Sequence, residues 1–314
     1  MKKSIIAIAV SSAALASVSV QAAEGSTVDV YGNIQYAYTD ADAGSNFEDN
    51  GSTIGLKGET KINDDLTAFF KYELEFKADQ KADRGVTNGY NQSKLDQAFV
   101  GLKGNFGKVQ VGSFDTIYNN AIQDGISQFE YLGPTKAGNT SEGDTIAYFS
   151  PSMNGFEVQV AAQVKGNNSE LATSNTDGTS AMAVVKYSTD LVSVALGYDA
   201  RENTSTDPKA TTGLAVTVMP MANLSVTGKY ETTEDTQNVL GLAARYGYGV
   251  GDVYASYQNV DPDAAGSNDF NEYATGVTYN LASNIYVYGE VGSFGNASNS
   301  NTETKTAVGV YYGF

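Results

Sequence analysis

Polar and apolar residues alternate along most of this chain, and no long apolar run interrupts the alternation after residue 20. A transmembrane helix needs about 20 consecutive apolar residues, which the remaining sequence does not offer. An amphipathic helix would repeat its apolar residues every 3.6 positions, and that pattern is also absent. A strand points successive side chains to opposite faces. The sequence therefore predicts an all-β protein whose strands have one apolar and one polar face.

The alternating segments are separated by connections that are short and long in turn. Residues 63–65 and 283–284 have tight-turn compositions, whereas 40–51 and 295–303 are longer and polar. The strands are predicted at 28–39, 52–62, 66–77, 94–104, 108–115, 144–151, 156–165, 179–188, 191–200, 210–219, 224–232, 237–247, 252–260, 271–281, 285–294 and 305–314. An even number of about sixteen strands with this loop alternation is typical of a transmembrane antiparallel β-barrel of the outer-membrane type. Closure of the sheet would satisfy every backbone donor and acceptor inside a bilayer.

Aromatic residues mark the face that is predicted to point outward. They are Tyr36, Tyr38, Phe76, Tyr230, Tyr279, Tyr286, Tyr288, Tyr312 and Phe314. Aromatic girdles at the two membrane interfaces are a feature of outer-membrane barrels. A soluble β-sandwich or β-helix is the alternative, because alternation alone does not exclude it. A soluble barrel would fill its interior with apolar side chains, whereas here one face of most strands is polar.

The N-terminal segment has the three parts of a secretory signal peptide. Two lysines follow Met1, an uncharged apolar stretch covers 4–20, and small residues surround Ala22. We expect cleavage after Ala22, which makes 1–22 a signal peptide and 23–314 a single barrel domain. A transmembrane anchor is the alternative, but the stretch is short and acidic sequence follows it. Cleavage removes two lysines, so the formal charge of −17 becomes more negative.

The residues that the chain lacks exclude several kinds of chemistry. It has no His, no Cys and no Trp. A hydrolase, a thiol enzyme and a zinc protein are therefore disfavoured, because each depends on one of the first two residues. No metal site and no cofactor is predicted. The 36 acidic residues against 19 basic ones also argue against nucleic acid as a partner.

Six segments, in order along the chain, resemble the Gram-negative general porins. They are Val28–Asn33, Ile54–Thr60, Ile62–Ala68, Ala98–Gly104, Val111–Asp115 and Val308–Phe314. The resemblance implies a homotrimer of sixteen-stranded barrels in the cell outer membrane of a Gram-negative bacterium. Each barrel would be a water-filled channel for passive diffusion of small hydrophilic solutes and ions. The expected partners are outer-membrane lipid, lipopolysaccharide and the barrel-assembly machinery, for which Tyr312 and Phe314 would be the recognition signal.

The resemblance also implies that the third long extracellular loop folds into the lumen. In this chain that loop is 115–143, the longest polar connection. Loops longer than about 15 residues usually have a function of their own. Asp115, Asp124 and Glu130 are predicted to form the loop side of the pore constriction. The alternative for each carboxylate is an ordinary solvated charge or a helix cap.

The opposite wall departs from the family pattern, in which arginines face the loop. Thr53 and Asp96 stand where relatives often have arginine, and the chain has three arginines in all: Arg84, Arg201 and Arg245. Strand parity places Lys57 and Lys71 on the wall beside Asp96, although each lysine is equally explained as a solvated charge. This acidic lining predicts a cation-preferring diffusion porin. An adhesin or receptor that acts through long extracellular loops is the alternative, and conductance would distinguish the two.

Overall fold

A computed structural model describes residues 18–20, 26–79, 93–138, 140, 142–164, 179–201 and 209–314, without the side chains of 18–20, 299 and 300. The predicted cleavage site at Ala22 and the arginine at position 84 lie outside these residues. Strand β1 (Val18–Val20) belongs to the segment predicted to be cleaved, and it pairs with β2. No described helix is both long enough and apolar enough to span a membrane.

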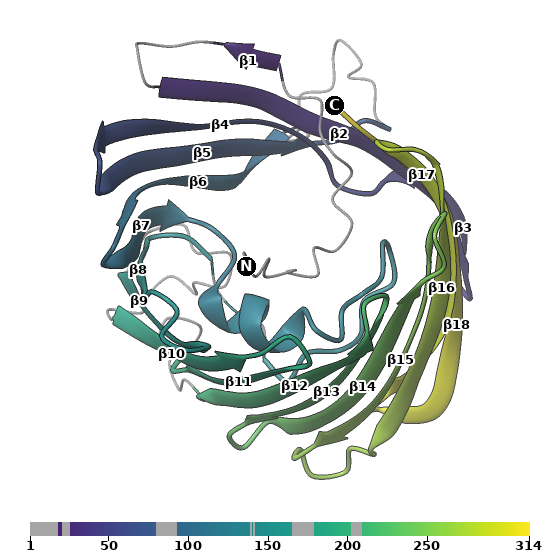
Figure 1. Cartoon of the computed structure of the whole chain (residues 1–314). Helices are drawn as coiled ribbons and strands as arrows, with labels where there is room; N and C mark the ends of the chain where they lie inside the picture. The colour runs from purple at the N-terminus through teal and green to yellow at the C-terminus, as the bar shows by residue number, and fades with distance from the viewer. Residues whose placement is uncertain are drawn as a thin grey trace, which may run out of the picture.

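One antiparallel sheet closes into a barrel around a central space (Figure 1). In the described residues the ring consists of sixteen strands, as predicted. They are β2 (Ser26–Ala41), β4 (Ser52–Asn63), β5 (Leu66–Phe76), β6 (Ser93–Gly104), β7 (Gly107–Ser113), β8 (Thr145–Phe149), β9 (Phe156–Val164), β10 (Thr179–Ser188), β11 (Val192–Asp199), β12 (Thr211–Met221), β13 (Leu224–Thr233), β14 (Gln237–Gly247), β15 (Asp252–Pro262), β16 (Phe270–Ala282), β17 (Ile285–Asn296) and β18 (Asn299–Gly313). Each strand pairs with its neighbour in the sequence, and β18 pairs with β2.

Two connections that the sequence predicted as long loops are strands instead. Strand β3 (Gly44–Asp49) folds back on the second half of β2, so it continues the line of β4. Strand β18 begins at Asn299, only three residues after β17 ends, and replaces most of the loop predicted at 295–303. Apart from Phe47 these two connections contain no large apolar residue, so they lack the apolar alternation on which the prediction relied.

The last residue of the chain completes the closure. The backbone N–H of Phe314 donates to the carbonyl of Gly32 at 2.9 Å, and the N–H of Gly32 donates back at 3.0 Å. The Phe314 ring lies directly over this glycine, because a Cβ at position 32 would come within 2.7 Å of it. Tyr312 points outward and is 47% exposed. The C-terminal aromatic strand therefore has a structural function, since it joins the two ends of the sheet.

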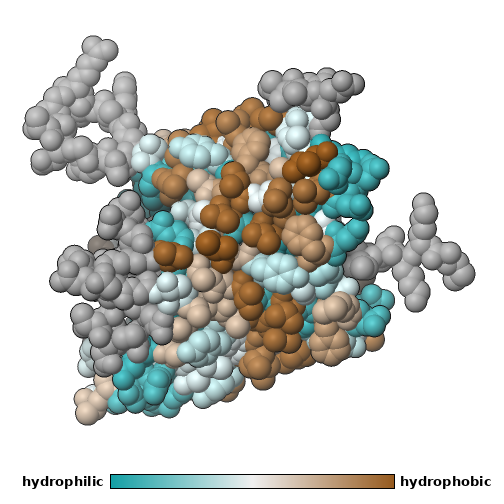
Figure 2. Space-filling model, turned by 90° about the vertical axis from the view of Figure 1, so that its left-hand side faces the viewer, coloured by the Kyte–Doolittle hydropathy of each residue, from teal (hydrophilic) through white to brown (hydrophobic). Residues whose placement is uncertain are grey.

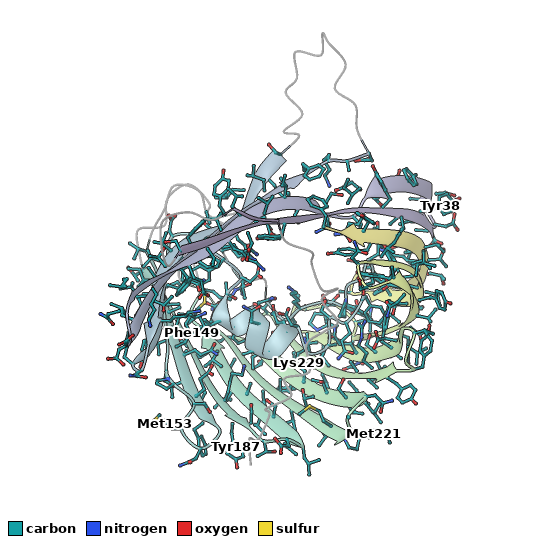
Figure 3. All side chains as sticks on the ribbon, turned by 45° about the horizontal axis from the view of Figure 1, so that its top comes forward. Tyr38, Phe149, Met153, Tyr187, Met221 and Lys229 are labelled. Atoms are coloured by element: carbon teal, nitrogen blue, oxygen red, sulfur yellow. The ribbon has the colours of Figure 1, made fainter. Side chains whose placement is uncertain are left out.

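The two faces of the strands differ as the alternation predicts. The outward side chains form an apolar surface, visible on the side of the barrel that lies on the left in Figure 1 (Figure 2). On these strands the exposed large apolar residues include Leu56, Tyr72, Val100, Leu102, Val111, Ile146 and Val160. Figure 3 shows Tyr38, Met153, Tyr187 and Met221 on the outside of the wall, whereas Lys229 lies inside it.

The aromatic girdle requires a correction at two positions. Tyr286 and Tyr288 were predicted to point outward, but Tyr288 is 3% exposed and both hydroxyls bond to groups inside the barrel. In this strand both faces are rich in apolar residues, so apolarity alone does not define the inward face. Glu290 shares the parity of the two tyrosines, and this charged residue is the signal that identifies the inward side.

Candidate functional site

The connection between β7 and β8, residues 114–144, lies inside the ring of strands and is called the inner loop below (Figure 1). Its first part contains a short π-helix, η1 (Asn119–Gln123). Tyr118 and Ile122 are fully buried against the inner face of β11 and β12. A Cβ on Gly197 or Gly213 of those strands would come within 2.9 Å of these two side chains. Small residues on the wall therefore make room for the helix.

A second apolar cluster fixes the start of the inner loop. Phe114 and Ile117 are buried there with four inward residues of β8 to β10, which are Ala147, Ala161, Met182 and Val184. Burial of one large apolar side chain stabilises a fold by about 1.5–3 kcal/mol. The first third of the inner loop is thus held against one side of the wall by a small hydrophobic core inside a polar barrel.

A buried ion pair lies beneath this part of the inner loop. Lys229 and Glu231 both point inward from β13, with 2.5 Å between Nζ and Oε2, and they are 3% and 0% exposed. Figure 3 shows Lys229 beside the helix. The hydroxyl of Tyr118 and the amide Nε2 of Gln123 donate to the other oxygen of Glu231, at 3.1 and 2.7 Å. The pair satisfies polar groups that the inner loop would otherwise leave buried and unpaired.

The later part of the inner loop is held by carboxylates on the far wall. Glu290 on β17 accepts the backbone N–H groups of Glu130, Tyr131 and Leu132 at 2.6, 3.1 and 2.9 Å. Glu272 on β16 accepts both the N–H and the hydroxyl of Thr135. Hydrogen bonds to an ionised carboxylate are stronger than neutral ones. The inner loop is therefore attached to opposite sides of the barrel. Glu231, Glu272 and Glu290 were not predicted as site residues, although inward parity marks all three.

The predicted wall residues come together with one predicted loop residue. Lys71 donates to Glu73 at 2.7 Å and to Gln97 at 3.1 Å, and Gln97 donates to Asp115 at 2.9 Å. The register between β5 and β6 shifts next to Asp96, so this residue is a bulge. The bulge brings the Asp96 carboxyl to Glu73 on the inner face.

Lys57 completes the group of charges on this wall. Its ammonium lies 5.1 Å from the centre of the Tyr31 ring, and that of Lys71 lies 5.7 Å from it. The ring lies against Gly55 of the paired strand β4, where a Cβ would be 2.5 Å from it. Both lysines are thus supported by an aromatic face inside the barrel.

Asp124 lies on the side of the inner loop that faces the central space. Its side chain is exposed and accepts a hydrogen bond from Asn119 at 2.8 Å, while Lys136 donates to the same Asn119 side chain at 2.8 Å. The surrounding protein removes part of the bulk water, and this desolvation raises the pKa of Asp124 to about 6, against the opposing charge of Lys136.

Glu130 is separated from the other predicted residues. Tyr286 donates to its carboxylate at 2.6 Å, and a guanidinium nitrogen of Arg245 lies 3.9 Å from it. Burial raises the pKa of Glu130, while the Tyr286 hydrogen bond and the Arg245 charge act in the opposite direction. Arg245 also lies 3.4 Å from Asp252 and donates to the carbonyl of Gln128. Glu130 is thus held against the wall by Tyr286 and Arg245, whereas the side chain of Asp124 is exposed.

This arrangement, an apolar outer face around a polar and charged interior, defines a membrane-spanning channel. A family model described as Gram-negative porin matches residues 4–301, and the chain belongs to this family. The "Monosaccharide porin" of a Halomonas species is 34% identical over the full length of both chains. Two solved structures share the fold. Salmonella typhi OmpF in complex with daunomycin has a TM-score of 0.74, with 21% identity over 95% of this chain and 100% of that chain. The anion-selective porin from Comamonas acidovorans has a TM-score of 0.73, with 19% identity over 92% and 100%.

The protein is therefore an outer-membrane diffusion channel of a Gram-negative bacterium and not an enzyme. Within the described residues, no three acidic, histidine or cysteine side chains gather closely enough to hold a metal ion. In a diffusion channel the relevant properties of such a site are the electrostatics and the width of the pore.

Proposed function

We propose that this porin passes small hydrophilic solutes and prefers cations over anions. The observation that carries the proposal is the unequal pairing of charges inside the barrel. Lys71, Lys229 and Arg245 each lie within salt-bridge distance of a carboxylate. Asp124, in contrast, is exposed towards the central space. A passing ion therefore meets the Asp124 carboxylate on the loop, while these three positive charges are compensated. Lys136 near Asp124 and Lys57 over the Tyr31 ring are further positive charges of the interior, and they reduce this preference.

The fold by itself does not determine selectivity, since a neighbour with the same fold is described as anion-selective. The wall residues at which this chain departs from the family pattern support a preference for cations instead. Asp96 adds a carboxyl group to the β4–β6 wall at a bulge, close to Asp115 of the inner loop. Lys71 on the same wall donates to Glu73, so the field of this lysine is partly cancelled, whereas the Lys57 ammonium lies over the Tyr31 ring.

The reversal potential across a planar bilayer under a potassium chloride gradient tests the proposal. We expect the sign that indicates preference for potassium, and an anion-selective potential would contradict it. Asp124→Asn removes the exposed carboxylate and should shift the potential towards zero. Addition of Glu130→Gln should add a smaller shift, because Glu130 faces Arg245 and Tyr286. Asp64→Asn is the matched control, since Asp64 lies in a short turn with a 97% exposed side chain.

We further propose that the channel is a homotrimer, embedded in outer-membrane lipid and lipopolysaccharide and inserted by the barrel-assembly machinery. An apolar groove on the outside of β4–β7 supports a contact between subunits, and its outward lining includes Gly58, Ala68, Phe70, Val100, Leu102 and Val111. Sedimentation in detergent should give the mass of three chains, and a monomer would contradict the assembly. Removal of Phe314 should reduce insertion, because this residue closes the sheet through Gly32.

A further inference from the structure

The short turn between β8 and β9 consists of an asparagine followed by a glycine. Two backbone hydrogen bonds between Met153 and Phe156, of 2.8 and 3.1 Å, close it around these two residues. Both have a positive φ, which is 53° for Asn154 and 92° for Gly155. Two-residue hairpins in which both central residues need positive φ favour the pair Asn–Gly. The geometry of the turn therefore selects the dipeptide in which an asparagine loses its side-chain amide most readily.

The reaction that removes the amide needs only the peptide and water. The backbone nitrogen of Gly155 forms a bond to the side-chain carbon Cγ of Asn154, and a glycine places no side chain in the way. The bond from Cγ to the amide nitrogen breaks, and this nitrogen leaves as ammonia together with the proton of the Gly155 N–H. Water then opens the succinimide ring at one of its two carbonyls and gives aspartate or isoaspartate. No atom is oxidised or reduced.

The reacting groups of this turn are accessible and unengaged. The side chain of Asn154 is exposed. Among the described residues it has no hydrogen-bond partner, and the N–H of Gly155 has none either. The Gly155 carbonyl accepts from the N–H of Ser188 at 2.9 Å, so this contact leaves the attacking nitrogen untouched. The carboxamide can therefore rotate towards that nitrogen while water surrounds both.

A second Asn–Gly pair, just before β4, has the same groups engaged in hydrogen bonds. The side-chain nitrogen of Asn50 donates to the carbonyl of Glu130 at 2.8 Å and to the hydroxyl of Tyr288 at 3.0 Å. The N–H of Gly51 donates to the carboxylate of Asp49 at 3.0 Å. Attack at this pair would require all three hydrogen bonds to break. The third Asn–Gly pair of the chain, at 88–89, lies outside the described residues.

We propose that Asn154 is a site of spontaneous deamidation and that Asn50 is protected by its contacts. Short turns lie at the periplasmic end of an outer-membrane barrel, so the product forms on that side of the membrane. Isoaspartate adds a methylene group to the main chain, which a two-residue turn between Met153 and Phe156 does not accommodate. Either product also adds a negative charge. The modified fraction therefore increases with the age of the protein and does not depend on transport.

Peptide mapping by mass spectrometry of the folded channel tests the proposal. The full chain is kept in detergent in a mildly alkaline buffer made with water that carries heavy oxygen. We expect the Asn154 peptide to exchange NH2 for OH with one heavy oxygen atom and to contain isoaspartate. In the same sample Asn50 should convert about tenfold more slowly or less, because three hydrogen bonds must break first. Equal conversion at the two positions, or an unmodified Asn154, would overturn the proposal.

Two controls separate the effect of the fold from that of the sequence. In channel unfolded by denaturant, Asn50 and Asn154 should convert at similar rates, since both precede glycine. If Asn50 stays slow when unfolded, its contacts are not the cause of the protection. Asn154→Gly keeps a residue that accepts positive φ and removes the reactive amide, so its conductance should be unchanged. Isoaspartate that still forms in the same peptide of this variant would place the reaction elsewhere and contradict the assignment.

Discussion

Both the β4–β6 wall and the β13–β17 wall carry acidic and basic side chains that point into the barrel. These side chains have different functions on the two walls. On β13–β17, Glu231, Glu272 and Glu290 are buried and accept hydrogen bonds from the inner loop. On β4–β6, Glu73 and Asp96 stand with two lysines on the wall that faces the inner loop across the passage. Whether an inward acid is a structural anchor or part of the pore lining depends on where the inner loop lies.

Removal of the buried ammonium should have the largest effect on the anchoring wall. Lys229→Met leaves the Glu231 carboxylate buried without its counter-charge. We expect the free energy of unfolding in detergent to fall by about 3–5 kcal/mol. Lys103→Met is the control, because Lys103 pairs with Glu59 at an exposed site and should cost less than about 1 kcal/mol. Similar losses in the two variants would show that the ion pair beneath the inner loop has no special importance.

The second largest effect is expected for Glu290, whose carboxylate accepts hydrogen bonds from three successive backbone N–H groups. Glu290→Ala leaves these donors of the inner loop without their acceptor, at an expected cost of about 3 kcal/mol. The released loop should also make single-channel currents noisier. Glu303→Ala removes an exposed carboxylate on β18 that lies 3.1 Å from the Lys305 ammonium, and it should leave both stability and current noise unchanged. Quiet currents in Glu290→Ala would contradict the anchoring function.

Two glycine substitutions compare how firmly an aromatic ring is held on each side of the barrel. A Cβ at Gly309 would come within 2.2 Å of the Tyr288 ring, and one at Gly55 would come within 2.5 Å of Tyr31. Asn50 donates to the Tyr288 hydroxyl, so that ring is held in place. We expect Gly309→Ala to destabilise by about 2 kcal/mol. Gly55→Ala should cost less and alter conductance instead, because Tyr31 supports Lys57.

Thermal unfolding and conductance measured on both variants check this contrast. Gly289→Ala is the matched control, because nothing lies within 4 Å of a Cβ at that position. It should be stable and conduct normally. A larger stability loss for Gly55→Ala than for Gly309→Ala would contradict the expectation that the Tyr288 ring is held more firmly than the Tyr31 ring.

The smallest effect concerns the pH dependence of selectivity. The pKa of Asp124 is about 6, so this carboxylate is about nine-tenths ionised at pH 7 and about one-tenth at pH 5. Cation preference should therefore decrease as the pH falls through 6. In Asp124→Asn the reversal potential should change less between pH 7 and pH 5. An identical pH profile in the two proteins would exclude Asp124 as a pore charge.

Much of the fold could be predicted because the alternation of residues is local information. The sixteen strands and the two faces of most of them followed from it. Tyr286 and Tyr288 were assigned to the wrong face because Val287 and Gly289 give the opposite face no charge. The bulge at Asp96 could not be predicted either, since a register shift depends on the partner strand and not on the bulged strand alone.

By itself, the sequence determined that this chain closes into a barrel with a polar interior, because a strand distributes its side chains every two residues. It also marked the long segment that could enter that interior. Only the tertiary structure decided which inward charges remain available to solutes. Glu130 and Glu290 are 160 residues apart in the sequence, and their contact depends on the path of the inner loop across the barrel. That path is fixed by burial of apolar side chains on one wall and by satisfaction of backbone donors on the other.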